Sequence, residues 1–170
     1  MMEFKDGKMF VYLLKYSVQS PFSNEYDLNI HSLGWDYVVS KLKDVYIGGG
    51  ELIIEKSTPI YNEGKYLDFK EVVGYESSDK YSFICDKRHG YLLRCYIEKT
   101  KEYPEGGYFY LVNKKFEFST KKITFEPYDD EWPEKYVNQD FELALIIFKE
   151  VYENGTLSLD RLCKTFSKTG

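Results

Sequence analysis

The sequence is poor in the residues that hold metal ions or cross-link small domains. It contains three cysteines, Cys85, Cys95 and Cys163, without a CxxC spacing, and two histidines, His31 and His89. Neither histidine lies near a second ligand at the spacing of a zinc site, so we expect no metal and no cofactor. An odd number of unpatterned cysteines is typical of reduced, partly buried thiols, and we therefore predict a cytoplasmic protein.

Arginine is also scarce. Arg88, Arg94 and Arg161 are the arginines among 23 basic residues, which stand against 28 acidic ones, and the formal net charge is -5. This balance disfavours a nucleic acid as the partner, because phosphate binding needs a concentrated positive surface. A basic protein is electrostatically the easier partner.

Long apolar runs are missing as well. The longest, Leu143–Phe148, falls far short of the roughly 20 residues that a membrane span requires. The chain starts Met-Met-Glu-Phe-Lys-Asp, without the apolar core of a signal peptide. We expect no membrane segment and no export signal.

The motifs of the familiar enzyme classes do not occur: there is no GxxxxGK(S/T), GxGxxG after a strand, GxSxG, HExxH or aspartate-rich calcium loop. The most specific candidate for enzyme chemistry is a nucleophilic Cys85 with His89 as its base. Strand alternation, however, turns the cysteine inward and leaves the histidine at a turn, too far away for proton transfer. Gly48–Gly50 follows a helix and precedes a strand, the reverse of the order in a phosphate-binding loop. We predict that the protein is not an enzyme.

Aromatic residues, in contrast, are abundant: 17 Tyr, 12 Phe and 2 Trp make up 18% of the 170 residues. This composition excludes disorder for the bulk of the chain. Because a chain of this length can bury a large core, we predict a single domain over residues 1–170.

Hydrophobic periodicity divides the first part of the chain into strands and one helix. Met9–Val18 is rich in aromatic and branched residues and predicts a strand, and Pro21–Gly34 predicts a loop. Apolar residues at helical offsets run from Trp35 to a stop at Gly48–Gly50. Alternation over Glu51–Ser57 predicts a strand with one wet face.

The clearest local prediction is a hairpin between Tyr81 and Glu98. Two alternating runs flank Arg88-His89-Gly90, and a turn at these three residues makes the numbers of cross-strand partners sum to 178. Three pairs then face the core: Tyr81 with Ile97, Phe83 with Cys95, and Cys85 with Leu93. The opposite face mixes polar and apolar side chains: Ser82, Asp86, Arg94 and Glu98 with Ile84, Leu92 and Tyr96. Cys85 and Cys95 become diagonal neighbours, in poor geometry for a disulfide.

The remaining elements follow from turn and capping signals. We predict strands at Tyr108–Phe118 and Lys121–Glu126, a turn at Pro104–Gly107 and an acidic loop at Asp129–Pro133. Asp140 opens a helix that ends at Asn154-Gly155 and carries one apolar face: Phe141, Leu145, Phe148 and Tyr152. Ser158 caps a last short helix with four apolar residues: Leu159, Leu162, Cys163 and Phe166.

Together these elements predict an α+β fold. Its sheet is mainly antiparallel with five to seven strands, and a helix from the N-terminal half and a C-terminal helix pack on it. Because the central strands follow one another without helices, a doubly wound parallel sheet is not expected.

The acidic segment that begins at Asp129 is the candidate binding site. Asp129, Asp130, Glu131 and Glu134 surround Trp132. Two interpretations are open: Trp132 packs on the sheet edge while the acids solvate a loop, or the aromatic ring anchors an interface with a basic protein.

Arg94, on the mixed face of the hairpin, has the same two interpretations. It forms an ion pair with Glu98 or another acid on the sheet surface, or it contributes to recognition.

Four stretches together resemble small bacterial immunity proteins. They are the helix opened by Trp35, Gly48–Ile54, Gly90–Tyr96, and Phe148–Gly155 followed by Leu157-Ser158. The group they resemble is the CdiI-like one, associated with contact-dependent growth inhibition and related polymorphic toxins, and the likeness spans about three quarters of the chain. It implies a cytoplasmic, non-enzymatic antidote that binds one cognate toxin. The acidic segment and Ser57–Ser78 have no counterpart in the group, so no binding residue is carried over.

A second class of function stays open beside this one. An aromatic-rich sheet can line a pocket, as in a small-molecule or carbohydrate-binding module or in an enzyme without recognisable motifs.

Overall fold

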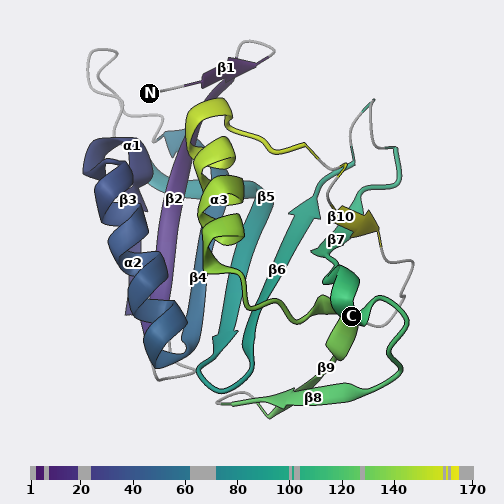
Figure 1. Ribbon diagram of the computed structural model, residues 1–170. Helices are drawn as coiled ribbons and strands as arrows, with labels where there is room; N and C mark the ends of the chain where they lie inside the picture. The colour runs from purple at the N-terminus through teal and green to yellow at the C-terminus, as the bar shows by residue number, and fades with distance from the viewer. Residues whose placement is uncertain are drawn as a thin grey trace.

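The computed structural model describes residues 3–5, 8–18, 24–61, 72–99, 101, 104–126, 129–158, 160 and 162–164. Figure 1 shows helices α2 (Trp35–Gly48) and α3 (Phe141–Asn154) side by side in front of a large sheet, with the hairpin of β8 (Lys122–Phe125) and β9 (Asp130–Pro133) at its lower right. The predicted α+β class is confirmed.

The main sheet is antiparallel throughout its described pairs. Its long strands stand in the order β2 (Lys8–Val18), β4 (Gly50–Tyr61), β5 (Val72–Asp86), β6 (Gly90–Ile97) and β7 (Gly107–Leu111). Three shorter strands extend it: β1 (Glu3–Lys5) and β3 (Asn24–Asn29) pair with β2, and β10 (Leu162–Lys164) pairs with β7.

Helix α2 has the predicted bounds, and the glycines after it are required by the backbone. Its side chains Val38, Leu42 and Val45 are fully buried. Gly50 has a φ of 129°, and a Cβ there would lie 2.1 Å from the carbonyl oxygen of Ser17 on β2. Only glycine allows the chain to leave the helix and enter the sheet at this distance.

Helix α3 also begins and ends as predicted. The carboxylate of Asp140 accepts the backbone N–H of Leu143, and Gly155 ends the helix at a φ of 70°. All four residues of the predicted face pack against the core under the helix: Phe148 is fully buried, and Phe141, Leu145 and Tyr152 are partly buried. The most deeply buried stripe runs through Ala144, Ile147, Phe148 and Val151, slightly rotated from the predicted face. Most of the helix is apolar, so periodicity could not select between two neighbouring stripes.

Four predicted elements are wrong in whole or in part, and in three of them a neighbouring strand supplies a pairing partner that local sequence does not reveal. The predicted loop Pro21–Gly34 contains β3 and the short helix α1 (Ile30–Leu33). The predicted strand from Tyr108 ends at Leu111, and Lys114–Phe116 forms a 3-10 turn, η1. The predicted acidic loop is mostly strand β9, paired with β8.

The predicted last helix is the fourth error. Leu162–Lys164 forms strand β10, which pairs with Phe109–Leu111 on β7. The unpaired edge of β7 offers backbone hydrogen bonds that override the helical pattern. Leu159 and Phe166, assigned to that helix, lie outside the described residues.

The β5–β6 hairpin has the predicted faces but a different register. Phe83 pairs with Leu93, and Cys85 pairs with Tyr91. The turn is therefore Lys87–His89, and Gly90 already belongs to β6. The backbone N–H of Arg88 donates to the Asp86 carboxylate at 2.8 Å, which closes the turn one residue early. A shift of two residues preserves side-chain faces, so the six predicted core residues still share one face.

Each face of the sheet has its own apolar cluster. The larger cluster lies under α2 and α3 and includes Phe83, Cys85 and Cys95. The smaller one lies on the opposite face, under β8, β9 and a second 3-10 turn, η2 (Glu134–Tyr136); it consists of Ile84, Leu92, Tyr110, Phe125, Tyr136 and Val137. Trp132 of the candidate site packs against this smaller cluster, which therefore determines where the site lies on the sheet.

Candidate protein-binding surface

Asp86 connects the chain just after β8 to the turn between β5 and β6. This side chain is 2% exposed, and its carboxylate accepts the backbone N–H groups of Arg88 and Glu126, each at 2.8 Å. Burial alone raises the pKa of Asp86, but these two hydrogen bonds and the charges of His89 and Arg88 outweigh it, so the net pKa is lowered. The ionised carboxylate therefore holds the end of β8 against the β5–β6 turn.

Trp132 joins β9 to the sheet. It pairs with Ile123 across the small hairpin, and its ring packs 6.3 Å from that of Tyr110, which itself stacks at 4.6 Å on Tyr136. The indole Nε1 is shielded and has no hydrogen-bond acceptor among the described residues. The ring thus packs on the sheet, as the first interpretation expects, and the role of Trp132 as an anchor for a partner stays a prediction.

The acidic residues around Trp132 divide into two groups. Asp129, Asp130 and Glu131 are exposed to solvent. Glu134 is mostly buried instead: it accepts a hydrogen bond of 2.8 Å from Ser119 and lies 3.9 Å from the ammonium of Lys121. The structure therefore brings three of the four carboxylates to the surface and keeps the fourth in an intramolecular contact.

The surface around these carboxylates is mixed in charge. Lys121 and Lys122, at the start of β8, are exposed. Arg88 forms an ion pair with Glu126, with 3.2 Å between the guanidinium and the carboxylate. The acidic character is therefore confined to the end of the hairpin where Asp129 and Asp130 lie.

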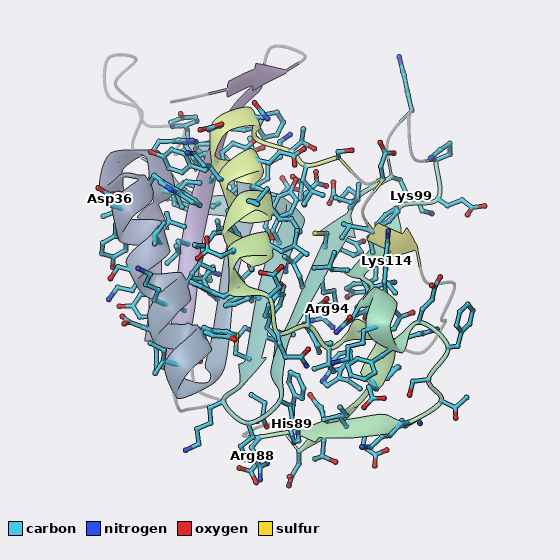
Figure 2. The ribbon with its side chains drawn as sticks, viewed as in Figure 1. Asp36, Arg88, His89, Arg94, Lys99 and Lys114 are labelled. Carbon is cyan, nitrogen blue, oxygen red and sulfur yellow. The ribbon has the colours of Figure 1, made fainter. Side chains whose placement is uncertain are left out.

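Arg94 of β6 lies beside this hairpin (Figure 2). The carbon of its guanidinium is 5.2 Å from the ring centre of Tyr108 and 5.6 Å from that of Trp132. No carboxylate among the described residues forms an ion pair with it, so the expected pairing with Glu98 is wrong. Contact with two aromatic rings holds the cation in place.

The rings that hold Arg94 are themselves supported. Tyr108 packs 5.1 Å from Tyr96, its direct partner across β6 and β7, and remains 38% exposed. Our interpretation of the sequence did not include Tyr96 or Tyr108 in the site. Their period-two spacing along the two strands was a signal, but the register that pairs them was not visible.

Cys85 and His89, the candidate nucleophile pair that strand alternation argued against, lie on opposite sides of the sheet. Cys85 is 1% exposed and faces the helices, and burial followed by the charge of Asp86 raises the pKa of its thiol. The ring of His89 stacks on Phe125, on the other side of the sheet, at 6.4 Å. Among the described residues, no group of three or more histidine, cysteine or carboxylate side chains could hold a metal ion.

No family model, no curated protein and no solved structure matches the chain. In the part that the structure describes, none of the helices has the length and apolarity needed to cross a bilayer.

Proposed function

We propose that the chain is an immunity protein that binds and neutralises a cognate bacterial toxin in the cytoplasm. The resemblance of the Trp35–Leu162 region to the CdiI-like group supports this proposal. The proposed docking surface consists of the exposed acidic residues Asp129, just before β9, and Asp130 and Glu131 on it, together with Arg94 and Tyr108.

The observation that carries the proposal is the division of β9 into an inner and an outer part. Trp132 packs against the smaller apolar cluster, while Asp129, Asp130 and Glu131 are exposed. A short acidic strand fixed to a core is a preorganised surface for a basic protein, because little conformational entropy is lost when it binds. Trp132 then supports the surface from inside and is not itself inserted into the toxin.

The test is binding to a candidate toxin domain, taken from the gene immediately upstream if that gene encodes a large secreted toxin. The charge-reversed double variant Asp129→Lys with Asp130→Lys should associate with it about tenfold more slowly at low salt, because attraction between opposite charges accelerates encounter. Its matched control is Asp36→Lys with Asp44→Lys, the same change in net charge at two exposed positions of α2, a helix that lies away from the β8–β9 hairpin (Figure 1).

Stopped-flow association at 20 to 300 mM salt measures the effect. A control variant slowed as much as the β9 variant would show that net charge alone matters and that the toxin docks elsewhere. Unchanged association of both variants would remove electrostatics from the proposal.

A binding module for carbohydrates is the second candidate, and the exposed ring of Tyr108 favours it. This ring is 38% exposed and is buttressed by Tyr96, as a platform for sugar stacking requires. Loss of glycan binding in Tyr108→Ala, with toxin binding absent in the wild type, would select this candidate.

A further inference from the structure

We infer that Arg94, held between Tyr108 and Trp132, is a carboxylate-binding site that receives an aspartate or glutamate side chain of the protein partner. That a protein partner supplies the carboxylate rests on the proposed function. That Arg94 binds a carboxylate rests on the structure. Arg94 lies on the face of β6 opposite the helices, in the middle of a strand that is paired on both sides, with Ser82 and with Tyr110.

The first argument is the free donor capacity of the guanidinium. Arg94 presents five N–H donors in a planar fork, and no carboxylate of the described residues occupies them. Its guanidinium lies over the faces of the Tyr108 and Trp132 rings. Ring faces restrain the cation but leave its edge donors unused, and two parallel N–H groups match the two oxygens of one carboxylate.

The second argument concerns preorganisation. Tyr108 is supported by Tyr96, and Trp132 by Tyr110, so both rings are fixed before a ligand arrives. A side chain that is already ordered loses less entropy on binding than a free surface arginine. This separates Arg94 from an ordinary solvated cation.

The third argument selects the ligand. Arg94 is the cation held over these two rings, and the protein has a net charge of -5, with exposed Asp130 and Glu131 on β9, the strand that carries Trp132. A single guanidinium in such a field suits a singly charged carboxylate better than a phosphate dianion. Arg94 is half-buried and the adjoining Tyr108 is 38% exposed, so the site is reached from the surface, which suits a side chain presented by another protein rather than an enclosed small molecule.

The chemistry is tested first on the protein alone. Sodium acetate is titrated into the nitrogen-15-labelled full chain at constant ionic strength, with chloride and inorganic phosphate as reference anions, while the Arg94 Nε–H and Trp132 Nε1–H resonances are followed. We expect acetate to shift both resonances at least twice as far as either reference. The acetate-induced shift of the Trp132 Nε1–H resonance should disappear in Arg94→Gln and fall at least twofold in Arg94→Lys, which keeps the charge but not the fork. Equal shifts for all three anions, or shifts that persist in Arg94→Gln, overturn the site.

The source of the carboxylate is tested with the same candidate toxin domain. Arg94→Gln should speed dissociation of the complex about tenfold or more, whereas Lys114→Gln, a nearby exposed cation on η1 (Figure 2), should leave the dissociation rate unchanged. Thermal unfolding of each variant confirms that it is folded. If acetate binds and the wild type binds toxin, but Arg94→Gln dissociates normally, the assignment to the partner is wrong. If acetate binds and the wild type does not bind toxin, the proposed function fails and the carboxylate comes from a free small molecule.

Discussion

The guanidinium carbon of Arg94 on β6 lies 5.6 Å from the centre of the Trp132 ring on β9. The cation and the aromatic side chain that the sequence singled out separately therefore belong to one cluster. Trp132 contacts the smaller apolar cluster through Tyr110 and presents a ring face to Arg94. The same Trp132 ring therefore packs the β8–β9 hairpin against the sheet and forms one side of the candidate site.

Trp132→Ala should destabilise the protein by about 2 to 4 kcal/mol, because it removes a large half-buried ring and leaves a cavity beside Tyr110. Urea unfolding monitored by far-UV circular dichroism measures the change. The control is Phe118→Ala, whose side chain is 92% exposed and whose loss should change stability by less than about 0.5 kcal/mol. A Trp132 effect as small as that of Phe118 would mean that the hairpin is not held by this ring.

Asp86→Asn should lower stability at neutral pH by about 1 to 3 kcal/mol and remove part of its dependence on pH. The pKa of Asp86 is lowered in the folded state, so the folded state binds fewer protons than the unfolded state between the two pKa values. The stabilisation is complete above the unfolded pKa, about 3.9, and is lost as the pH falls through the lower, folded pKa.

Urea midpoints of wild type and Asp86→Asn, compared from pH 7 down to pH 2, test this prediction. The two proteins should converge at acid pH. A difference in stability that stays constant over the whole range would show that the carboxylate charge of Asp86 is not what fastens β8 to the hairpin turn.

Gly50→Ala should cost about 2 kcal/mol or more, because a Cβ at this position would lie 2.1 Å from the Ser17 carbonyl oxygen at a φ of 129°. Gly74→Ala is the matched control within the same sheet. Its Cβ would meet only the end of the Ile60 side chain, at 3.9 Å, so its cost should stay below about 1 kcal/mol. Thermal unfolding of both variants distinguishes them, and equal melting temperatures would contradict the close approach of β2 and β4.

Cys85 and Cys95 should resist thiol reagents in the native protein. Both are buried, and burial raises the pKa of each thiol, so neither the thiolate nor a path to it is available. In a Cys163→Ser background, labelling with Ellman's reagent at pH 8 should be at least about a hundredfold slower in buffer than in 6 M guanidinium. Fast labelling of the folded protein would contradict the inward orientation of this face.

The ends of both long helices could be predicted from the sequence, because their signals are local. Gly48–Gly50 ends α2. Asp140 caps the first turn of α3, and Gly155 ends its last turn. The face taken by each residue of β5 and β6 was predictable for a similar reason, since alternation along one strand determines it.

The register of that hairpin and the short edge strands depended on tertiary structure. The hydrogen bonds of Asp86 and the contact of Gly90 with Asn138 move the turn by one residue, and alternation cannot detect a shift of two in the pairing. Polar segments such as β3 and β9 become strands only because neighbouring edges offer backbone partners.

The sequence by itself identified Arg94 and Trp132 as residues with two alternative roles each. It did not determine whether the two side chains contact each other. Whether a cation on one strand meets an aromatic ring on another depends on how β8 and β9 pack over β6 and β7. That packing results from burial of the Tyr110 and Phe125 cluster and from the Asp86 hydrogen bond to Glu126. Such contacts join segments distant in the chain, and because apolar burial is not directional, no local pattern specifies which segments will meet.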